Sequence, residues 1–286
     1  MKVFTLCLLL SSSVCLFPQK KDSTYASEVP KPTQSEVRYG KHERNFLDFW
    51  KAKSKKPAPV AFIIHGGGWK GGSKERLDRF ADANALLKVG ISVVAINYRY
   101  VTDDESPPVK APLHDAARAL QFIRSKAKEW QINPEKIAAL GFSAGGHLTL
   151  MTSTTSQTNS YEAIDELDKL PCHVNYAVPV YPAYVLEDGA NGANKAKGNN
   201  STIVKDFAFD AKTPSMCLIH GDTDQYSPMN SVAVYHKLRT MNIPAELHIY
   251  AKIGHGFGAR PTLDGKNDHI GDWLNRAYES LKVLGF

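Results

Sequence analysis

Six short apolar runs rich in β-branched residues limit how this 286-residue chain can fold more than any other feature. Because apolar and polar residues do not alternate within them, they predict strands that are buried on both faces of a sheet. The runs are VAFII, ISVVAINY, KIAALGF, NYAVPVY, MCLIHG and AELHIY. Apolar residues spaced near 3.6 predict helices between and after them, at 76–88, 113–128, from 147 onward, 231–241 and 273–284. The alternation predicts an α/β fold, with a mostly parallel sheet, right-handed crossovers and helices on both faces.

The N-terminal stretch differs from the rest of the chain. Lys2 precedes VFTLCLLLSSSVCLF, which has the length and composition of a secretory signal. We therefore expect a signal peptide at 1–20, a linker at 21–35 and a single domain at 36–286. No later run approaches the roughly 18 apolar residues of a membrane-spanning helix, so we expect a secreted or periplasmic protein without stable membrane insertion. A lipoprotein anchor at Cys15 is the less favoured alternative.

Charge and cysteine content exclude several classes of protein. The 35 basic and 29 acidic residues give a net charge of +6. Few aromatic residues lie among the basic ones, so we expect no nucleic-acid partner. Only Cys172 and Cys217 follow the predicted signal, which is too few for a disulfide framework. Whether these two pair is left open, because a free thiol suits the buried-looking strand around Cys217 equally well.

The sequence Gly141-Phe142-Ser143-Ala144-Gly145 stands between the apolar run KIAAL and the helical stretch GHLTLMTS. A strand, G-x-S-x-G and a helix in that order predict a sharp turn that presents Ser143 as a nucleophile. The flanking glycines allow the strand and the helix to approach closely.

A second glycine-rich motif, HGGGW at 65–69, follows the first of the six apolar runs. Glycines leave backbone N–H groups uncovered, and such groups can stabilise the oxyanion that forms when a serine attacks a carbonyl. We therefore expect Gly67, Gly68 and Ala144 to donate to the oxyanion. His65 is expected to brace the loop rather than to act as a base.

A serine nucleophile needs a general base and an acidic partner, in the chain order Ser, Asp, His. His255 lies in AKIGHGFG, a loop after the last apolar run, and is the predicted base. The loop after MCLIHG offers Asp222 and Asp224. We choose Asp224, because Asp222 is close enough to the strand to serve as a turn or cap residue. A metal site at these two aspartates is not favoured, since further ligands at a suitable spacing are missing.

These motifs resemble those of the esterase/lipase superfamily of α/β-hydrolases, and more narrowly of the bacterial feruloyl-esterase and acetylesterase-like group related to the hormone-sensitive-lipase esterases. The resemblance implies an α/β-hydrolase fold with a minimal cap, and it implies that Asp224 completes a catalytic triad. Tyr226 and Ser227 depart from the small apolar pair common in that group, which predicts a narrower acyl pocket. The matching stretches are HGGGWKGGSK, INYRY, HDAARALQFIR, NPEKIAALGFSAGGHL, HGDTDQYSP and GHGFG.

The residues and the resemblance together predict a secreted serine esterase that requires no cofactor. Acetyl or feruloyl esters on carbohydrate, or other short acyl esters, are the substrates that the resemblance implies, so the partner is a small-molecule or polysaccharide-linked ester. Trp69, Phe142 and Tyr226 are expected to line the pocket, and the unpatterned stretch 187–212 is expected to be a flap or mobile segment. Two alternatives stay open: a serine peptidase or amidase with the same triad, and a non-catalytic binding protein.

Overall fold

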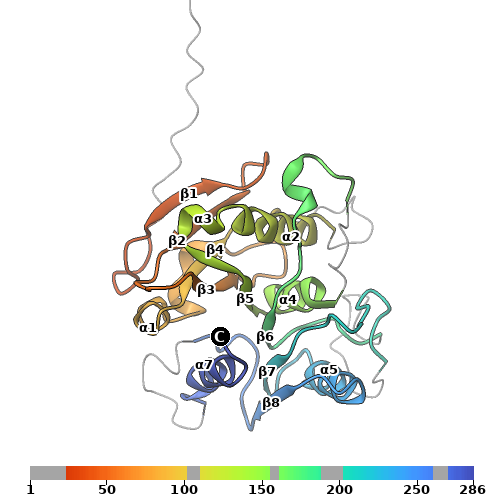
Figure 1. The fold of residues 1–286 in the computed structure, drawn as a ribbon. Helices are drawn as coiled ribbons and strands as arrows, with labels where there is room; N and C mark the ends of the chain where they lie inside the picture. Colours follow the sequence, from red (N-terminus) through yellow and green to blue (C-terminus); the bar gives the residue numbers. More distant parts are fainter. Residues whose placement is uncertain (1–23, 102–109, 155–160, 188–201, 260–269) are drawn as a thin grey trace, which may run out of the picture.

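One mixed sheet organises the part of the chain that the computed structural model describes, residues 24–101, 110–154, 161–187, 202–259 and 270–286. The strand order is β1-β2-β4-β3-β5-β6-β7-β8 (Figure 1). The first two strands are antiparallel to their neighbours and all later pairs are parallel, so the prediction of a mostly parallel α/β sheet is confirmed. The strands are β1 Gln34–Arg38, β2 Phe46–Trp50, β3 Ala58–Ile64, β4 Ser92–Ile96, β5 Ile132–Phe142, β6 Tyr176–Val180, β7 Met216–Gly221 and β8 Ala245–Tyr250.

The predicted helical segments need two corrections. The segment 113–128 divides at Lys126 into the helices Lys110–Ser125 and Ala127–Trp130. The segment 76–88 is not one helix, because Arg76 has non-helical backbone angles and Asp82 caps a separate helix by accepting from the N–H of Ala85. An aspartate side chain at this position competes with the preceding turn and favours a new start. The helices are η1 Lys74–Arg79, α1 Ala83–Lys88, α2 Lys110–Ser125, α3 Ala127–Trp130, α4 Ala144–Thr154, η2 Glu166–Lys169, α5 Met229–Thr240 and α7 Trp273–Val283.

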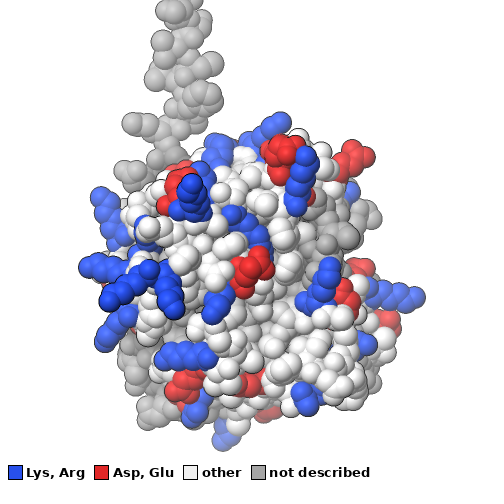
Figure 2. Space-filling model, in the orientation of Figure 1, with Lys and Arg blue, Asp and Glu red and all other residues white. Residues whose placement is uncertain are grey.

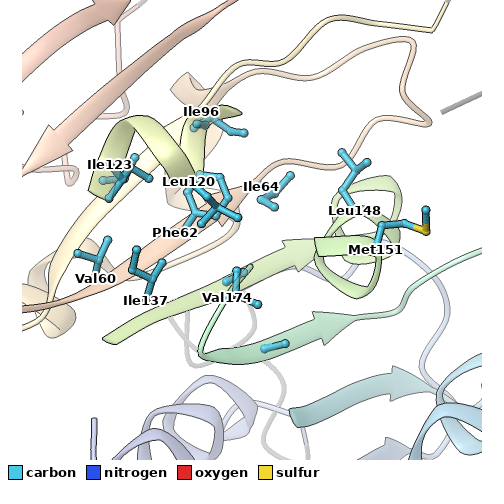
Figure 3. Packing of buried hydrophobic residues seen from close by; sticks show 14 of the residues in the cluster. Val60, Phe62, Ile64, Ile96, Leu120, Ile123, Ile137, Leu148, Met151 and Val174 are labelled. Carbon is cyan, nitrogen blue, oxygen red and sulfur yellow. The ribbon is translucent and has the colours of Figure 1, made fainter. Parts of the chain in front are cut away.

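Two apolar clusters cover the two faces of the sheet. Successive side chains of a strand point to opposite faces, so in β3 Phe62 and Ile64 belong to one cluster, and Ala61 and Ile63 to the other. The first cluster also includes residues of α2, α3, α4 and α5, and part of it is seen in Figure 3. The second includes residues of α1 and α7, which lie on the other side of the sheet (Figure 1). Burial on both faces explains why the six runs are apolar throughout.

The described part of the linker expected at 21–35 contacts the sheet. β1 begins at Gln34. The Tyr25 hydroxyl donates to Asp48 over 2.5 Å, and the Trp50 indole N–H donates to the Pro30 carbonyl over 2.6 Å. Residues 1–23, which include the predicted signal peptide, lie outside the described residues.

Part of the predicted flap at 187–212 also packs on the domain. Residues 188–201 lie outside the described residues, but Ile203 forms a β-bridge with Leu186. Phe207 is buried, and its ring lies 5.0 Å from that of His147. The segment from 202 to 212 is therefore anchored at least at these two points.

The cysteines, the hydropathy of the helices and the surface charge can each be compared with what the sequence led us to expect. Cys172 and Cys217 are both buried free thiols, so they do not form a disulfide. Among the described helices, none combines the length and the hydropathy that crossing a bilayer requires. Basic and acidic side chains are interspersed over the face seen in Figure 2, as expected for ordinary solvated surface.

Parallel strands bring distant loops together. The chain segments that follow β3, β5, β7 and β8 all leave the sheet at the carboxyl ends of these strands, which share one edge. Ligand sites of open α/β sheets form at this edge. It carries the HGGGW loop, the G-x-S-x-G turn and the two loops that hold the predicted acid and base.

Candidate active site

Ser143 occupies the sharp turn between β5 and α4. Its φ of 55° lies in the left-handed region, which is strained for a residue with a side chain. The turn is held because the N–H of Ser143 donates to the Val180 carbonyl over 3.0 Å, and its carbonyl accepts from the N–H of His147 over 2.9 Å. Gly145 is required here, since a Cβ at this position would lie 2.2 Å from the carbonyl oxygen of Ile64. The first turn of α4 therefore rests directly on the end of β3.

Ser143, His255 and Asp224 form a continuous chain of side-chain contacts. The Ser143 Oγ lies 2.8 Å from Nε2 of His255, and Nδ1 of His255 lies 2.7 Å from Oδ2 of Asp224. An ionised carboxylate can only accept, so Nδ1 carries the proton and donates to Asp224. Nε2 is then the acceptor for the Ser143 hydroxyl. The three residues that the sequence selected are thus brought together in the geometry of a nucleophile, a base and an orienting carboxylate.

Asp224 is held as a buried anion. Its side chain has no exposed surface, and Oδ1 accepts from the N–H of Tyr226 over 2.8 Å. Burial by itself raises the pKa of Asp224, but interactions with His220 and His255 and the N–H of Tyr226 outweigh it, so this pKa lies well below its ordinary value. His220 is fully buried beside it, with Nε2 3.4 Å from Oδ2 of Asp224 and Nδ1 2.8 Å from the Ser231 Oγ.

His220 is a residue of the site that sequence reasoning missed. Burial lowers the pKa of His220, so the ring is neutral. A proton on Nε2 faces Asp224, and Nδ1 then accepts from the Ser231 hydroxyl. His220 lies in MCLIHG, directly before the loop that carries Asp224, and this position was the available signal for a role in the site. The apolar run around it, however, indicated only a strand.

The alternative aspartate lies elsewhere. Asp222 is exposed, and its N–H donates to the Tyr250 carbonyl over 2.9 Å, which continues the pairing of β7 and β8. The structure therefore places Asp224, and not Asp222, against His255.

The glycine loop lies over the serine. Gly67 and Gly68 have φ of 124° and 60° and line the same cavity as Ser143. A Cβ at Gly67 would lie 2.2 Å from the Gly71 carbonyl oxygen, so this position excludes any side chain. The N–H of Ala144 belongs to the first turn of α4, where N–H groups have no partner within the helix. These positions suit the predicted donors.

His65 and Tyr100 brace the glycine loop. Nδ1 of His65 donates to the Gly66 carbonyl over 2.7 Å, and the imidazole stacks on the ring of Tyr98 at 4.2 Å. The Tyr100 hydroxyl donates to the Gly72 carbonyl over 2.6 Å. Burial lowers the pKa of His65 to about 3, so its ring is neutral at physiological pH. These contacts agree with the expected bracing role of His65.

The site opens into a cavity of about 410 Å³. Phe142 and Tyr226 line it, as the sequence predicts, but Trp69 does not. The indole of Trp69 instead contacts the rings of His147 at 5.1 Å and Tyr184 at 5.6 Å, which hold it away from the cavity. The full lining is Gly66, Gly67, Gly68, Arg76, Arg79, Phe80, Phe142, Ser143, Tyr181, Gln225, Tyr226, His255, Gly256, Phe257 and Gly258.

Possible metal ligands in the described part of the chain gather away from this cavity. Ligand atoms of Cys217, Glu246 and His248 lie within 4.8 Å of one another. Glu246 already accepts from the Ser280 hydroxyl over 2.7 Å and lies 3.2 Å from Nε2 of His248. This group belongs to β7 and β8 and does not contribute to the serine site.

The fold and the serine turn define an α/β-hydrolase. The structure is similar to the acetyl ester-xyloside bifunctional hydrolase of Caldicellulosiruptor lactoaceticus, with a TM-score of 0.72 and 24% sequence identity. The similarity covers 91% of this chain and 99% of that one. Within this fold class, the BD-FAE family model matches residues 47–238. The chain therefore belongs to the BD-FAE family.

Several curated relatives are esterases by name, among them the following two. The acetylxylan esterase of Xylanibacter ruminicola is 27% identical over 236 residues, which is 78% of this chain and 43% of the relative. Esterase LipC of Mycobacterium tuberculosis is 31% identical over 160 residues, 53% of this chain and 37% of the relative. This chain thus matches less than half the length of either protein.

Proposed function

We propose that this chain is a serine-dependent carboxylic ester hydrolase that removes short or aromatic acyl groups, of the acetyl or feruloyl type, from carbohydrate. The observation that carries the proposal is the continuous chain from Ser143 through His255 to Asp224 at the wall of the cavity. The family membership and the names of the relatives support it.

The reaction follows from the positions of these groups. The Oγ of Ser143 attacks the ester carbonyl while its proton moves to Nε2 of His255. The C–O bond to the alcohol then breaks, and the leaving alkoxide takes the proton back from His255. A water molecule attacks the acyl-enzyme, again losing its proton to His255, and the acid leaves with Ser143 restored. Asp224 stabilises the imidazolium in both half-reactions and keeps Nδ1 protonated.

The oxyanion of each tetrahedral intermediate is assigned to the N–H groups of Gly67, Gly68 and Ala144. These donors are fixed before the substrate arrives, because the loop is braced by His65 and Ala144 starts a buried helix. Losing one such donor typically reduces kcat by about 10² to 10³.

The dimensions of the site favour a small acyl group. A cavity of about 410 Å³ lies near the lower end of ligand pockets, and the rings of Phe142, Tyr181 and Phe257 form an apolar part of its wall. Tyr226, whose ring lies 4.7 Å from that of His255, occupies space beside the base. An acetyl or an aromatic acyl group matches these surfaces better than a long chain does.

The proposal is tested by hydrolysis of 4-nitrophenyl acetate, butyrate and octanoate, with methyl ferulate and acetylated xylan alongside. Ser143→Ala should reduce kcat by on the order of 10⁶. Ser125→Ala removes a hydroxyl from the exposed end of α2 and should leave turnover unchanged. If neither the wild type nor Ser143→Ala hydrolyses any of these esters, the esterase proposal is refuted. Hydrolysis of peptide amides and then simple binding would be measured next.

We also propose that residues 1–20 are a signal peptide, that 21–35 leads into the domain and that 36–286 forms one catalytic domain of an exported protein. The charge and apolar pattern of the first 20 residues support export. N-terminal sequencing of protein recovered outside the cytoplasm should give a start near residue 21. An uncleaved start, or a lipid-modified Cys15, would contradict this assignment.

A further inference from the structure

Two arginines line the cavity that holds Ser143. Arg76 and Arg79 both belong to η1 and are both exposed to solvent. They are three residues apart and, although the backbone of Arg76 is not helical, both line the same cavity. The proposed ester hydrolysis needs neither of them, because the nucleophile, the base and the oxyanion donors all come from other segments.

The carboxylate of Glu75, next to Arg76 in the chain, is engaged elsewhere. Glu75 pairs with Lys74 over 2.8 Å, and Lys74 also binds Glu36 and Asp48. No aspartate or glutamate is among the described residues that line the cavity. Within the described part of the chain, neither Arg76 nor Arg79 takes part in an ion pair. Two guanidinium groups therefore face a pocket whose described lining carries no opposing charge.

The segment that carries the arginines is fixed between the two halves of the site. The Arg79 carbonyl accepts from the N–H of Ala259 over 2.7 Å, which ties η1 to the loop of His255. The ring of the next residue, Phe80, contacts that of Phe142 at a tilt, with ring centroids 4.8 Å apart. Leu77 is fully buried in the second apolar cluster. Little ordering of the backbone is then needed when an anion binds.

We propose that the natural ester carries a carboxylate, which Arg76 and Arg79 bind at the rim of the cavity while Ser143 attacks the ester carbonyl. This inference rests on the proposed esterase function and narrows its substrate class to acidic esters. The guanidinium groups present planar pairs of donors that match a carboxylate. The carboxylate has two sources: the acyl group, as in a dicarboxylic half-ester, or the sugar, as in an acylated uronic acid.

The experiment compares matched pairs of neutral and anionic esters. In the acyl arm, monomethyl succinate is compared with methyl butyrate. In the sugar arm, a monoacetylated methyl glucuronoside is compared with the same ester of methyl glucoside. The measured quantity is the selectivity ratio, kcat/KM for the anionic ester divided by kcat/KM for its neutral partner. We expect a ratio of about ten or more in one arm, which identifies the source of the carboxylate.

Substitutions then assign the preference to the two arginines. Arg76→Gln with Arg79→Gln should lower the ratio about tenfold or more, a change of about 1.4 kcal/mol or more. Replacing both by lysine keeps the charge but not the planar donors, and should retain part of the preference. Arg239→Gln removes an exposed charge from the far end of α5 and should leave the ratio unchanged. About 1 M NaCl, where the Debye length is about 3 Å, should lower the ratio of the wild type.

The outcomes separate the two proposals. A ratio near one in both arms, with neutral esters still hydrolysed, overturns the acidic-substrate inference and leaves the esterase intact. A high ratio that the double glutamine variant retains also overturns it, because the preference then comes from other residues. If the protein hydrolyses no ester of either charge, the proposed function itself fails.

Discussion

Replacement of Asp224 by asparagine tests the site with the smallest change of shape. The carboxylate accepts from Nδ1 of His255 over 2.7 Å and from the N–H of Tyr226 over 2.8 Å, and it lies 3.4 Å from Nε2 of His220. An amide has one oxygen and one NH₂ group in place of two equivalent acceptors. The single amide oxygen cannot accept from both the N–H of Tyr226 and Nδ1 of His255.

The magnitude follows from these contacts. If the amide NH₂ faces His255, Nδ1 must accept, so the proton moves to Nε2 and points at Ser143. That tautomer cannot receive the serine proton. The loss of a charged hydrogen bond to the imidazolium contributes about 1.5–3 kcal/mol, and the wrong tautomer accounts for the rest of the roughly 5.4 kcal/mol that this substitution typically costs a serine triad. This corresponds to a decrease of about 10⁴ in kcat.

The assay is turnover of 4-nitrophenyl acetate at neutral pH, with circular dichroism to verify folding. Asp222→Asn is the matched control, because it makes the same chemical change two residues away at an exposed position, and it should keep turnover within about twofold of the wild type. The reasoning is refuted if Asp224→Asn keeps more than about a tenth of the activity, or if Asp222→Asn shows the larger loss.

Three further results are expected. Gly67→Ala, whose Cβ would lie 2.2 Å from a carbonyl oxygen, should lower kcat about 10²-fold or more in the ester assay, whereas Gly68→Ala, whose Cβ meets nothing within 4 Å, should lower it less. Burial lowers the pKa of His147 from 6.5 to about 4, so between these values the unfolded chain binds the extra proton and stability falls with falling pH. Urea unfolding at about pH 7 and about pH 5 should show a loss of about 2 kcal/mol from this group, and the loss should be smaller by that amount in His147→Gln. Lys74→Met leaves the buried Asp48 without its cation and should lower the free energy of unfolding by about 3–5 kcal/mol; a loss below about 1 kcal/mol in urea would contradict this.

The fold could be predicted because its signals are local. Apolar runs without alternation require burial on both faces, and helical spacing between them leaves a parallel sheet as the solution. One of the two predicted helices that proved to be divided, the segment 76–88, failed for a local reason as well. Asp82 offers its side chain as a cap, and this contact outweighs a continuous apolar spacing.

The candidate site could be predicted in part. The turn at Ser143 and the glycines at 67 and 68 follow from backbone requirements within a few residues. His255 and Asp224 were chosen from chain order and neighbouring glycines, and their roles stay predictions until the variants are measured. The choice between Asp222 and Asp224 depends on which side chain turns inward after β7, and this is set by the pairing of Asp222 with Tyr250 on β8.

The sequence by itself determined the strands, the serine turn and the glycine loop, because each depends on the backbone freedom and side chains of adjacent residues. Tertiary structure decided which side chains line the cavity besides Phe142 and Tyr226. Trp69 turns to the rings of His147 and Tyr184. The exposed arginines of η1 line the cavity, and their segment is held there by a hydrogen bond from the N–H of Ala259 to the Arg79 carbonyl. The direction of a surface side chain is set by contacts between segments that are distant in sequence, and no local pattern records those contacts.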